Sequence, residues 1–340
     1  MSDPHPRRER ARPTEAPARP RDTARLGARQ VLFGGGAFDV SGEHQNQKGW
    51  DIFELGQRSF WAVPDAIDWS RPIREDPEHA EPIAAMLEFL CPGEKAAVTG
   101  ASLISSNMQS EEAQFYFAEQ ALEEAKHYDA MRRVVANLRG RPMDPPPFLV
   151  RLLYSFGVID RDDTAFMMGS INIIGEHLAH QILHKIRPVA TDPQLIALLT
   201  LIGKDESRHI AAGKKFFPEV FPQFKKNRRK ILAKNLATTI VVAMATYHLI
   251  NPMQKLDIDV ADIMEAMYQH YSDVTHGFPA FPEQALLDTL VTMARRATPL
   301  AVRSIRALTT ENGELRPERL VAACERALTS PRALREILAA

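Results

Sequence analysis

Two glutamate–histidine pairs of the form Glu-x-x-His are the residues in this sequence whose types and spacing most directly indicate chemistry. They are Glu124 with His127 and Glu206 with His209. On a helix, residues three positions apart share a face, so each pair presents one carboxylate and one imidazole to the same point. This mixture of hard oxygen and imidazole suits iron and manganese, and the lack of thiolate disfavours structural zinc.

Each pair has a partner glutamate 30 residues upstream, Glu94 for the first pair and Glu176 for the second. All three positions repeat at one offset of 82 residues, and an acid precedes each pair, Glu123 or Asp205. Both upstream glutamates lie among apolar residues, where an unpaired carboxylate is costly. Thirty residues are enough for half a helix, a short turn and half an antiparallel helix, so each glutamate can return beside its pair.

Two such hairpins facing each other would place four carboxylates and two imidazoles around one point. This is the di-iron or di-manganese arrangement of ferritin-like four-helix bundles. The alternative interpretation is that these residues are solvated or form salt bridges on helix surfaces. Matching neighbours at matched spacing favour the metal site, with two metal ions per chain, Fe/Fe or Mn/Fe.

The elements that must position these residues are helices. Ser110 is a candidate N-cap for a helix that ends at Gly140, and a second helix over 164–187 stops before Pro188. Asp192 followed by Pro193 opens a third, which is expected to end near residue 218. No stretch alternates as a strand does, so the sequence predicts an all-α fold.

The remaining chain divides into four predicted regions. Residues 1–30 carry eight Arg and five Pro and are expected to be a disordered tail. Residues 31–80 are expected to be an irregular, aromatic-containing lead-in, and residues 81–220 the dimetal four-helix bundle, with a kink or restart at Pro92 and Gly93. Residues 221–340 are expected to form additional helices over 224–250, 258–272, 282–308 and 316–339, which pack on the bundle or form a dimer interface.

Composition excludes several classes of protein. The 42 Lys and Arg nearly balance the 43 Asp and Glu, which removes the electrostatic argument for binding nucleic acid. The longest apolar run, residues 236–250, is shorter than the roughly 20 residues that a membrane span needs. Two cysteines are too few for a disulfide scaffold and indicate a reducing compartment. A cytoplasmic protein is therefore expected.

The stretches Gly-Glu94-Lys-Ala-Ala-Val-Thr, Glu123-Glu124-Ala-Lys-His127, Gly-Glu176 and Asp205-Glu206-Ser-Arg-His209-Ile resemble the ribonucleotide-reductase small-subunit superfamily. That superfamily includes bacterial multicomponent monooxygenase hydroxylases and ligand-binding Mn/Fe oxidases, whose start the run Phe60-Trp61-Ala-Val-Pro-Asp also resembles. The resemblance covers roughly residues 50 to 220. It implies that Glu124 and Glu206 can bridge the two metals, and that Glu123 and Asp205 hold the ligand histidines of the opposite half.

Three positions depart from the patterns of these relatives. Met131 stands where reductase small subunits carry their radical tyrosine, and the chain end also lacks the radical-relay tyrosine, so a reductase role is not expected. Ile171 stands where the ligand-binding oxidases carry a cross-linking tyrosine. Ile202 stands where arylamine N-oxygenases carry an extra histidine ligand, which lowers the expectation of N-oxygenation.

His180 is a candidate catalytic residue particular to this chain. It follows Glu176 by four residues and His184 follows by eight, so the three lie near one helical stripe. His180 could serve as an additional ligand, a proton donor or a substrate contact. The alternative is a core histidine bonded to a backbone carbonyl.

The resemblance implies an O₂-dependent oxidase or oxygenase. Ala, Val, Met, Ile and Phe surround the predicted ligands and suggest an apolar pocket, so we expect an apolar or amphipathic small-molecule substrate. Electrons would come from a separate ferredoxin or reductase, because the chain carries no flavin or iron–sulfur motif. A homodimer is expected. The competing possibilities are a ferroxidase or iron-binding protein without an organic substrate, and an N-oxygenase of an amine.

Overall fold

The computed structural model describes residues 47–144, 163–245, 247–276 and 292, and within these ranges every regular element is helical. This confirms the all-α prediction. The elements are α2 (Gln47–Ser59), α3 (Val63–Ala66), α4 (Pro77–Asn107), α5 (Glu111–Arg139), α7 (Thr164–Met168), the π-helix η1 (Gly169–Gly175), α8 (Glu176–Ile186), α9 (Pro193–Ala245), α10 (Tyr247–Lys255) and α11 (Val260–His276).

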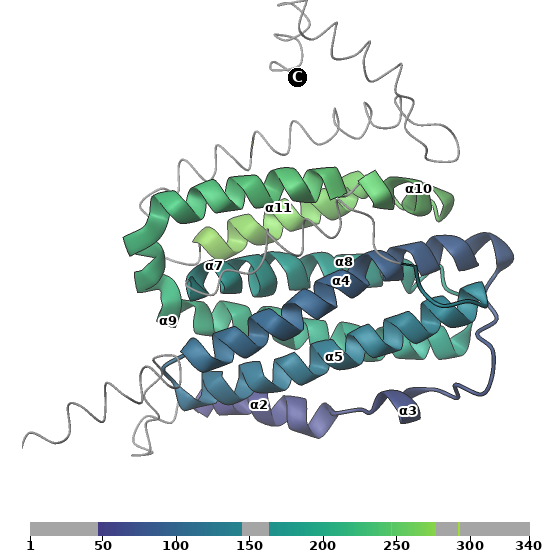
Figure 1. The fold of residues 1–340 in the computed structure, drawn as a ribbon, viewed down its shortest axis with the longest axis horizontal. Helices are drawn as coiled ribbons and strands as arrows, with labels where there is room; N and C mark the ends of the chain where they lie inside the picture. Colours follow the sequence, from purple (N-terminus) through teal and green to yellow (C-terminus); the bar gives the residue numbers. More distant parts are fainter. Residues whose placement is uncertain (1–46, 145–162, 246, 277–291, 293–340) are drawn as a thin grey trace, which may run out of the picture.

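Four helical segments form a bundle: α4, α5, α8 and the first part of α9. Helix α4 packs along α5, and α8 packs along α9, while contacts of α5 with α9 and of α4 with α8 join the two pairs (Figure 1). The short helix α7 and η1 precede α8 and also pack on α9. The remaining helices cover this bundle, with α2 on α5, α10 on α4 and α11 on α8.

The predicted helix boundaries have identifiable chemical causes. Helix α5 ends at Gly140, whose φ of 65° is the left-handed conformation that glycine adopts without strain. Asp163 caps α7 by accepting a hydrogen bond from the Phe166 N–H, and Asp192 accepts one from the Gln194 N–H at the start of α9. Ser110 occupies the N-cap position of α5, but its hydroxyl donates to Glu219 and not to the helix.

Two expectations about the helices were wrong in detail, and a third is narrowed. Helix α4 continues unbroken through Pro92, so of the kink or restart expected there the restart does not occur. Helix α9 is assigned through Pro218 and Pro222 to Ala245, so it does not end near residue 218; Figure 1 shows its course turning sharply between its two halves, as prolines inside a helix permit. The helix predicted over 164–187 is not α-helical throughout, because η1 (Gly169–Gly175) has the wider π-helical pattern just before Glu176.

The lead-in over 31–80 was expected to be irregular, yet its described part begins with the 13-residue helix α2. The Trp50 ring lies 5.8 Å from the Phe53 ring and 5.6 Å from the Phe115 ring of α5, centroid to centroid. These aromatic contacts dock α2 on the bundle. Tertiary packing therefore supports a helix where the local Gly, Pro and Asp content did not indicate one.

Two apolar clusters lie on either side of the bundle centre. One gathers residues from α4, α8, α9 and α10, including Leu87, Ile182 and Met253, and the other gathers residues around Phe117, Met168 and Phe216. No helix in the described part of the chain is long and apolar enough to cross a membrane. The predicted tail over 1–30 and the predicted helices over 282–308 and 316–339 lie outside the described residues, apart from residue 292.

Candidate metal centre

The structure brings the six predicted ligands to one place in the middle of the bundle. Helix α4 contributes one of them, α5 two, α8 one and α9 two. All six side chains are buried, with the two histidines fully inaccessible to solvent. They are Glu94, Glu124, His127, Glu176, Glu206 and His209.

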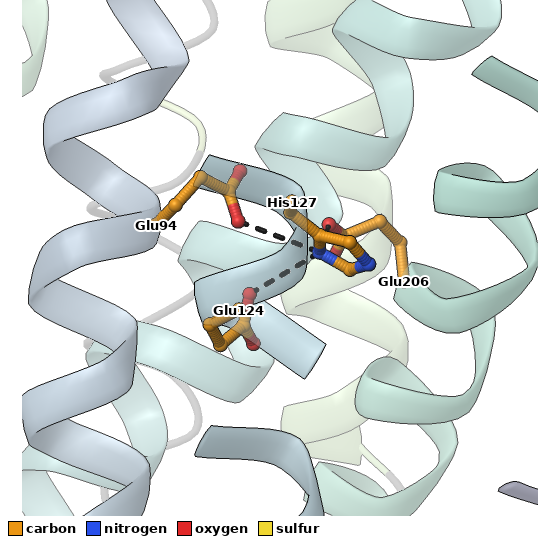
Figure 2. Close-up of side chains that lie close together, drawn as sticks. All are labelled: Glu94, Glu124, His127 and Glu206. Atoms are coloured by element: carbon orange, nitrogen blue, oxygen red, sulfur yellow. Dashed lines mark ion pairs between the residues drawn. The ribbon is translucent and has the colours of Figure 1, made fainter. Parts of the chain in front are cut away.

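Three carboxylates converge on the Nδ1 atom of His127. The distances are 3.1 Å to Glu206 Oε1, 3.4 Å to Glu124 Oε2 and 3.5 Å to Glu94 Oε2. Figure 2 shows the three carboxyl groups turned toward this imidazole from separate helices. Together these four side chains form a group that could hold one metal ion.

A second group forms around His209. Its Nδ1 atom lies 3.1 Å from Glu124 Oε1 and 3.5 Å from both Glu176 Oε2 and Glu206 Oε2. Glu124 and Glu206 therefore belong to both groups. Each turns one oxygen toward His127 and the other toward His209, which is the geometry of a carboxylate bridging two ions.

Unpartnered buried atoms support this assignment. The side-chain atoms without a hydrogen-bond partner include Nδ1 of His127 and of His209, Oε2 of Glu124 and both oxygens of Glu206. Buried polar atoms are normally satisfied, so a group of orphaned acceptors and ring nitrogens facing one point is unusual. These atoms are the donors that a metal ion would take, and the residues fit a dinuclear metal site.

The two histidines are held from behind by acids of the opposite hairpin. His127 Nε2 lies 3.1 Å from Asp205 Oδ2, and His209 Nε2 lies 2.9 Å from Glu123 Oε2. A carboxylate can only accept, so each Nε2 carries the proton and donates. The tautomer is thereby set, and Nδ1 is the nitrogen available to a metal. The crossed pairing implied by the family resemblance is present.

Two cations neutralise these supporting acids. The Arg208 guanidinium lies 2.6 Å from Glu123 Oε1 and 2.7 Å from Asp205 Oδ1, both from Nη2. Lys126 Nζ lies 3.4 Å from Asp205 and 3.7 Å from Glu123. All four side chains are buried, so two negative and two positive charges balance behind the site.

Trp61, which lies between α2 and α3, also contacts this group of charged residues. Its indole N–H donates to Asp205 Oδ2 at 2.8 Å, and its ring stacks on the His127 ring at 6.2 Å between centroids. Lys126 Nζ lies 4.6 Å from the centre of the Trp61 ring and 4.5 Å from that of Phe60. The aromatic pair therefore shields the buried charges and orients His127.

Gln120 and Asn172 form a second supporting chain on the other side. The Gln120 amide donates to Glu124 Oε1 and to Glu176 Oε1, at 2.9 Å each. Asn172 in η1 donates to the Gln120 carbonyl oxygen at 2.8 Å, so the orientation of the Gln120 amide is determined. Two carboxylates of the second group are thus held in place by one amide.

The charge states follow from burial and from these neighbours. Burial raises the pKa of the Glu94 and Glu176 carboxyl groups well above the ordinary value, and nearby carboxylates add to the effect. Burial also opposes ionisation of Glu124, but His209 and His127 outweigh it and lower its pKa well below the ordinary value. Burial would lower the pKa of His127, yet its hydrogen bond to Asp205 and the carboxylates that face Nδ1 raise it well above the ordinary value. Without metal each imidazole therefore favours a second proton, on Nδ1, which binding of metal must displace.

Sequence reasoning predicted Glu123 and Asp205 but missed the residues that support them and the ligands. One signal for two of the missed residues was present. Lys126 and Arg208 stand immediately before the two histidines and repeat at the same 82-residue offset as the ligands. Trp61 was expected as an aromatic residue of the lead-in and as part of the resemblance to relatives, but not as a partner of Asp205. Gln120 and Asn172 show no pattern in the sequence, because each matters only through a contact between separate helices.

His180 belongs to neither ligand group. Its side chain is half-buried and lines a pocket between α8 and α9, and its Nδ1 atom is buried without a hydrogen-bond partner. It stacks 6.2 Å from the exposed His184 ring. Burial lowers its pKa, although the negative charge of Glu206 opposes this effect, so it lies within electrostatic reach of the site.

The three departures from the family patterns pack as ordinary apolar residues. Met131, Ile171 and Ile202 are each at most 2% exposed and belong to the two apolar clusters. Of the residues expected around a substrate pocket, Ala97, Phe117, Met167, Met168 and Ile173 also lie in one of these clusters, and Val98 is partly exposed.

No protein-family model and no curated protein sequence matches the chain. Among solved structures, it is similar to an R2-like ligand-binding oxidase from Sulfolobus acidocaldarius, with 18% identity and a TM-score of 0.43 over 82% of this chain and 97% of that one. It is also similar to a point mutant of an R2-like ligand-binding oxidase with an aerobically reconstituted Mn/Fe cofactor, with 15% identity and a TM-score of 0.45 over 81% and 97% of the two chains.

The geometry of this chain itself classifies the site. Four helices deliver two Glu-x-x-His motifs and two further glutamates to one buried point, and two of the carboxylates are shared between two groups. The protein is therefore an all-α protein with the four-helix arrangement of the ferritin-like dimetal-carboxylate proteins.

Proposed function

We propose that the chain binds two metal ions, Fe/Fe or Mn/Fe, and uses them as an O₂-dependent oxidase or oxygenase of an apolar or amphipathic small molecule. The observation that carries the proposal is the pair of ligand groups sharing Glu124 and Glu206. A reduced pair of such ions supplies electrons to O₂ when bound. The solved Mn/Fe structure to which the chain is similar supports Mn/Fe as one of the two combinations to test.

The roles of the protein's own residues follow from the site geometry. Glu94 with His127, and Glu176 with His209, would each hold one ion, and Glu124 and Glu206 would hold both. Asp205 and Glu123 keep the protons on the outer ring nitrogens. The apolar clusters on either side exclude water, which strengthens every charge interaction at the site.

Metal content tests the first half of the proposal. Protein loaded with Fe(II) alone, or with Mn(II) and Fe(II) together, should bind two ions per chain by elemental analysis. The double variant with Glu124→Ala and His209→Ala should lose both ions, because it removes a shared ligand and an imidazole. A stoichiometry near zero in the parent protein, or an unchanged one in the variant, would overturn the site.

Single-turnover reaction with O₂ tests the second half. Small molecules that co-purify with the chain would be identified by mass spectrometry and then mixed with the reduced, metal-loaded protein. A ligand that gains oxygen or loses hydrogen supports the oxidase, and an amine gaining oxygen would assign N-oxygenation. Repeated Fe(II) oxidation with many irons stored per chain and no organic ligand would instead assign a ferroxidase.

His180 is proposed as a residue that contributes a proton or a contact beside the site. His180→Ala should then alter the optical spectrum of the metal-loaded protein or its rate of reaction with O₂. A change in thermal stability alone would assign it to packing. A separate ferredoxin or reductase as electron donor and a homodimeric assembly belong to the same proposal, and are tested by reduction assays and by sedimentation.

A further inference from the structure

A pocket of about 360 Å³ lies between α8 and α9. Helix α8 and its C-cap residue supply His180, His184 and Arg187, and α9 supplies Thr200, Lys204 and Ser207. Glu176 is one turn before His180, and Glu206 directly precedes Ser207. The pocket therefore lies against the two helices that carry half of the ligands, without containing any ligand.

The basic side chains in this pocket have no acidic partner. Within the described ranges, Arg187, Lys204 and His184 form no ion pair, and no carboxylate lines the pocket. Neighbouring cations on the same helices do find partners: Lys185 lies 3.1 Å from Asp262, and Arg208 is paired with Glu123 and Asp205. Positive charge left uncompensated in a hollow favours an anion.

Helix-end electrostatics explain only part of this charge. Arg187 lies at the C-terminus of α8, where a cation stabilises the helix dipole. Lys204 lies well inside α9, where no such stabilisation applies, and yet it lines the same hollow. The helix dipole of α8 therefore does not explain why positive side chains from both helices line the same pocket.

One further group in the pocket suits an oxyanion: His180 adds an imidazole whose Nδ1 is buried and unpartnered. Thr200 and Ser207 also line the pocket, but their hydroxyls donate to the carbonyl groups of Ile196 and Gly203 at 2.7 and 2.8 Å. Leu183 and Leu199 are buried and form an apolar floor. A hollow of this volume fits a small molecule, whereas an acidic protein partner would need a wider and flatter surface.

We propose that the pocket between α8 and α9 binds the oxyanion group of a small molecule, a carboxylate or a phosphate, through Lys204, Arg187 and His180. The Lys204 ammonium and the Arg187 guanidinium supply charge, and His180 supplies a hydrogen bond. This site is separate from the six metal ligands and goes beyond the proposed oxidase function. Its occupation does not require that metal be bound.

Calorimetric titration of the full chain at low salt tests the proposal, with inorganic phosphate and with succinate as separate probes. Each titration is made on metal-loaded and on metal-free protein. Lys204→Glu reverses one exposed charge in the pocket. Lys255→Glu is the matched control, because it reverses an exposed lysine on α10 away from the pocket.

We expect saturable binding of at least one probe, in both metal states, with affinity lowered at least tenfold by Lys204→Glu and less than twofold by Lys255→Glu. Binding of phosphate alone assigns a phosphate ester as the ligand class, and binding of succinate alone assigns a carboxylate. Absence of binding by both probes overturns the proposal, as does equal weakening by the two variants. Binding that disappears with the metal and ignores Lys204→Glu would place the anion on the ions and also overturn it.

Discussion

Replacing Asp205 by asparagine should weaken one of the two metal ions selectively. The Asp205 carboxylate accepts from His127 Nε2 at 3.1 Å, from the Trp61 indole at 2.8 Å and from Arg208 at 2.7 Å. An amide has one acceptor oxygen for all these donors, and its NH₂ group meets at least one of them as a second donor. With the amide oxygen in the Oδ2 position the NH₂ group faces Arg208, and in either orientation His127 loses the negative charge that makes Nδ1 a good ligand.

The expected loss is 10- to 100-fold in affinity for the ion beside His127, or about 1.4–2.7 kcal/mol at 25 °C. The ion beside His209 should be affected much less, because Glu123 supports that ring. Competition titration of Fe(II) against a chelator should therefore show two unequal sites in Asp205→Asn. Glu123→Gln should produce the reciprocal pattern at the other ion.

Glu119→Gln is the matched control, since it makes the same acid-to-amide change on α5 without contacting either histidine. Glu119 accepts from Gln57 at 2.8 Å, and its substitution should change metal affinity less than twofold. Circular dichroism confirms that each variant retains its helical content. The reasoning would be refuted by an Asp205→Asn isotherm identical to that of the parent protein, or by equal losses in Asp205→Asn and Glu119→Gln.

Three further predictions concern stability. Arg208→Met should lower the free energy of unfolding, measured by denaturant titration, by about 3 kcal/mol, because it leaves the buried Glu123 and Asp205 with Lys126 as their only cation. The control is Arg58→Met, which breaks an exposed ion pair with Glu54 and should cost less than about 1 kcal/mol. Gly213→Ala should cost about 1–3 kcal/mol in the same assay, because its Cβ would lie 2.6 Å from Asn172 Cβ, whereas Gly203→Ala meets nothing within 4 Å and should be neutral or stabilising. Burial raises the pKa of Glu119 to about 7, so the carboxyl favours the folded state at low pH, and that advantage is lost as the pH rises through 7. The melting temperature of the parent protein relative to Glu119→Gln should accordingly fall between pH 5 and pH 8, and a constant difference would contradict the assignment.

The sequence by itself determined which residues gather at the candidate metal centre. Glu94 with Glu124 and His127 repeats as Glu176 with Glu206 and His209 at one offset, because each half of the bundle is a helical hairpin that returns over the same 30 residues from its upstream glutamate to its pair. A three-residue spacing on a helix and a 30-residue return between helices are local properties of the chain. The six residues could therefore be predicted as candidate ligands before any fold was known.

Only the tertiary structure decided how that centre is supported. Trp61 reaches Asp205 across 144 positions of sequence, and Asn172 reaches Gln120 across 52, and neither distance follows from helical periodicity. The continuation of α9 past Pro218 likewise depends on more than local sequence, as the prolines predicted an end there. The pocket between α8 and α9 exists only because the packing of these helices brings Arg187 and Lys204 together. Such contacts depend on the relative placement of whole helices, which burial of the two apolar clusters determines and which no local pattern encodes.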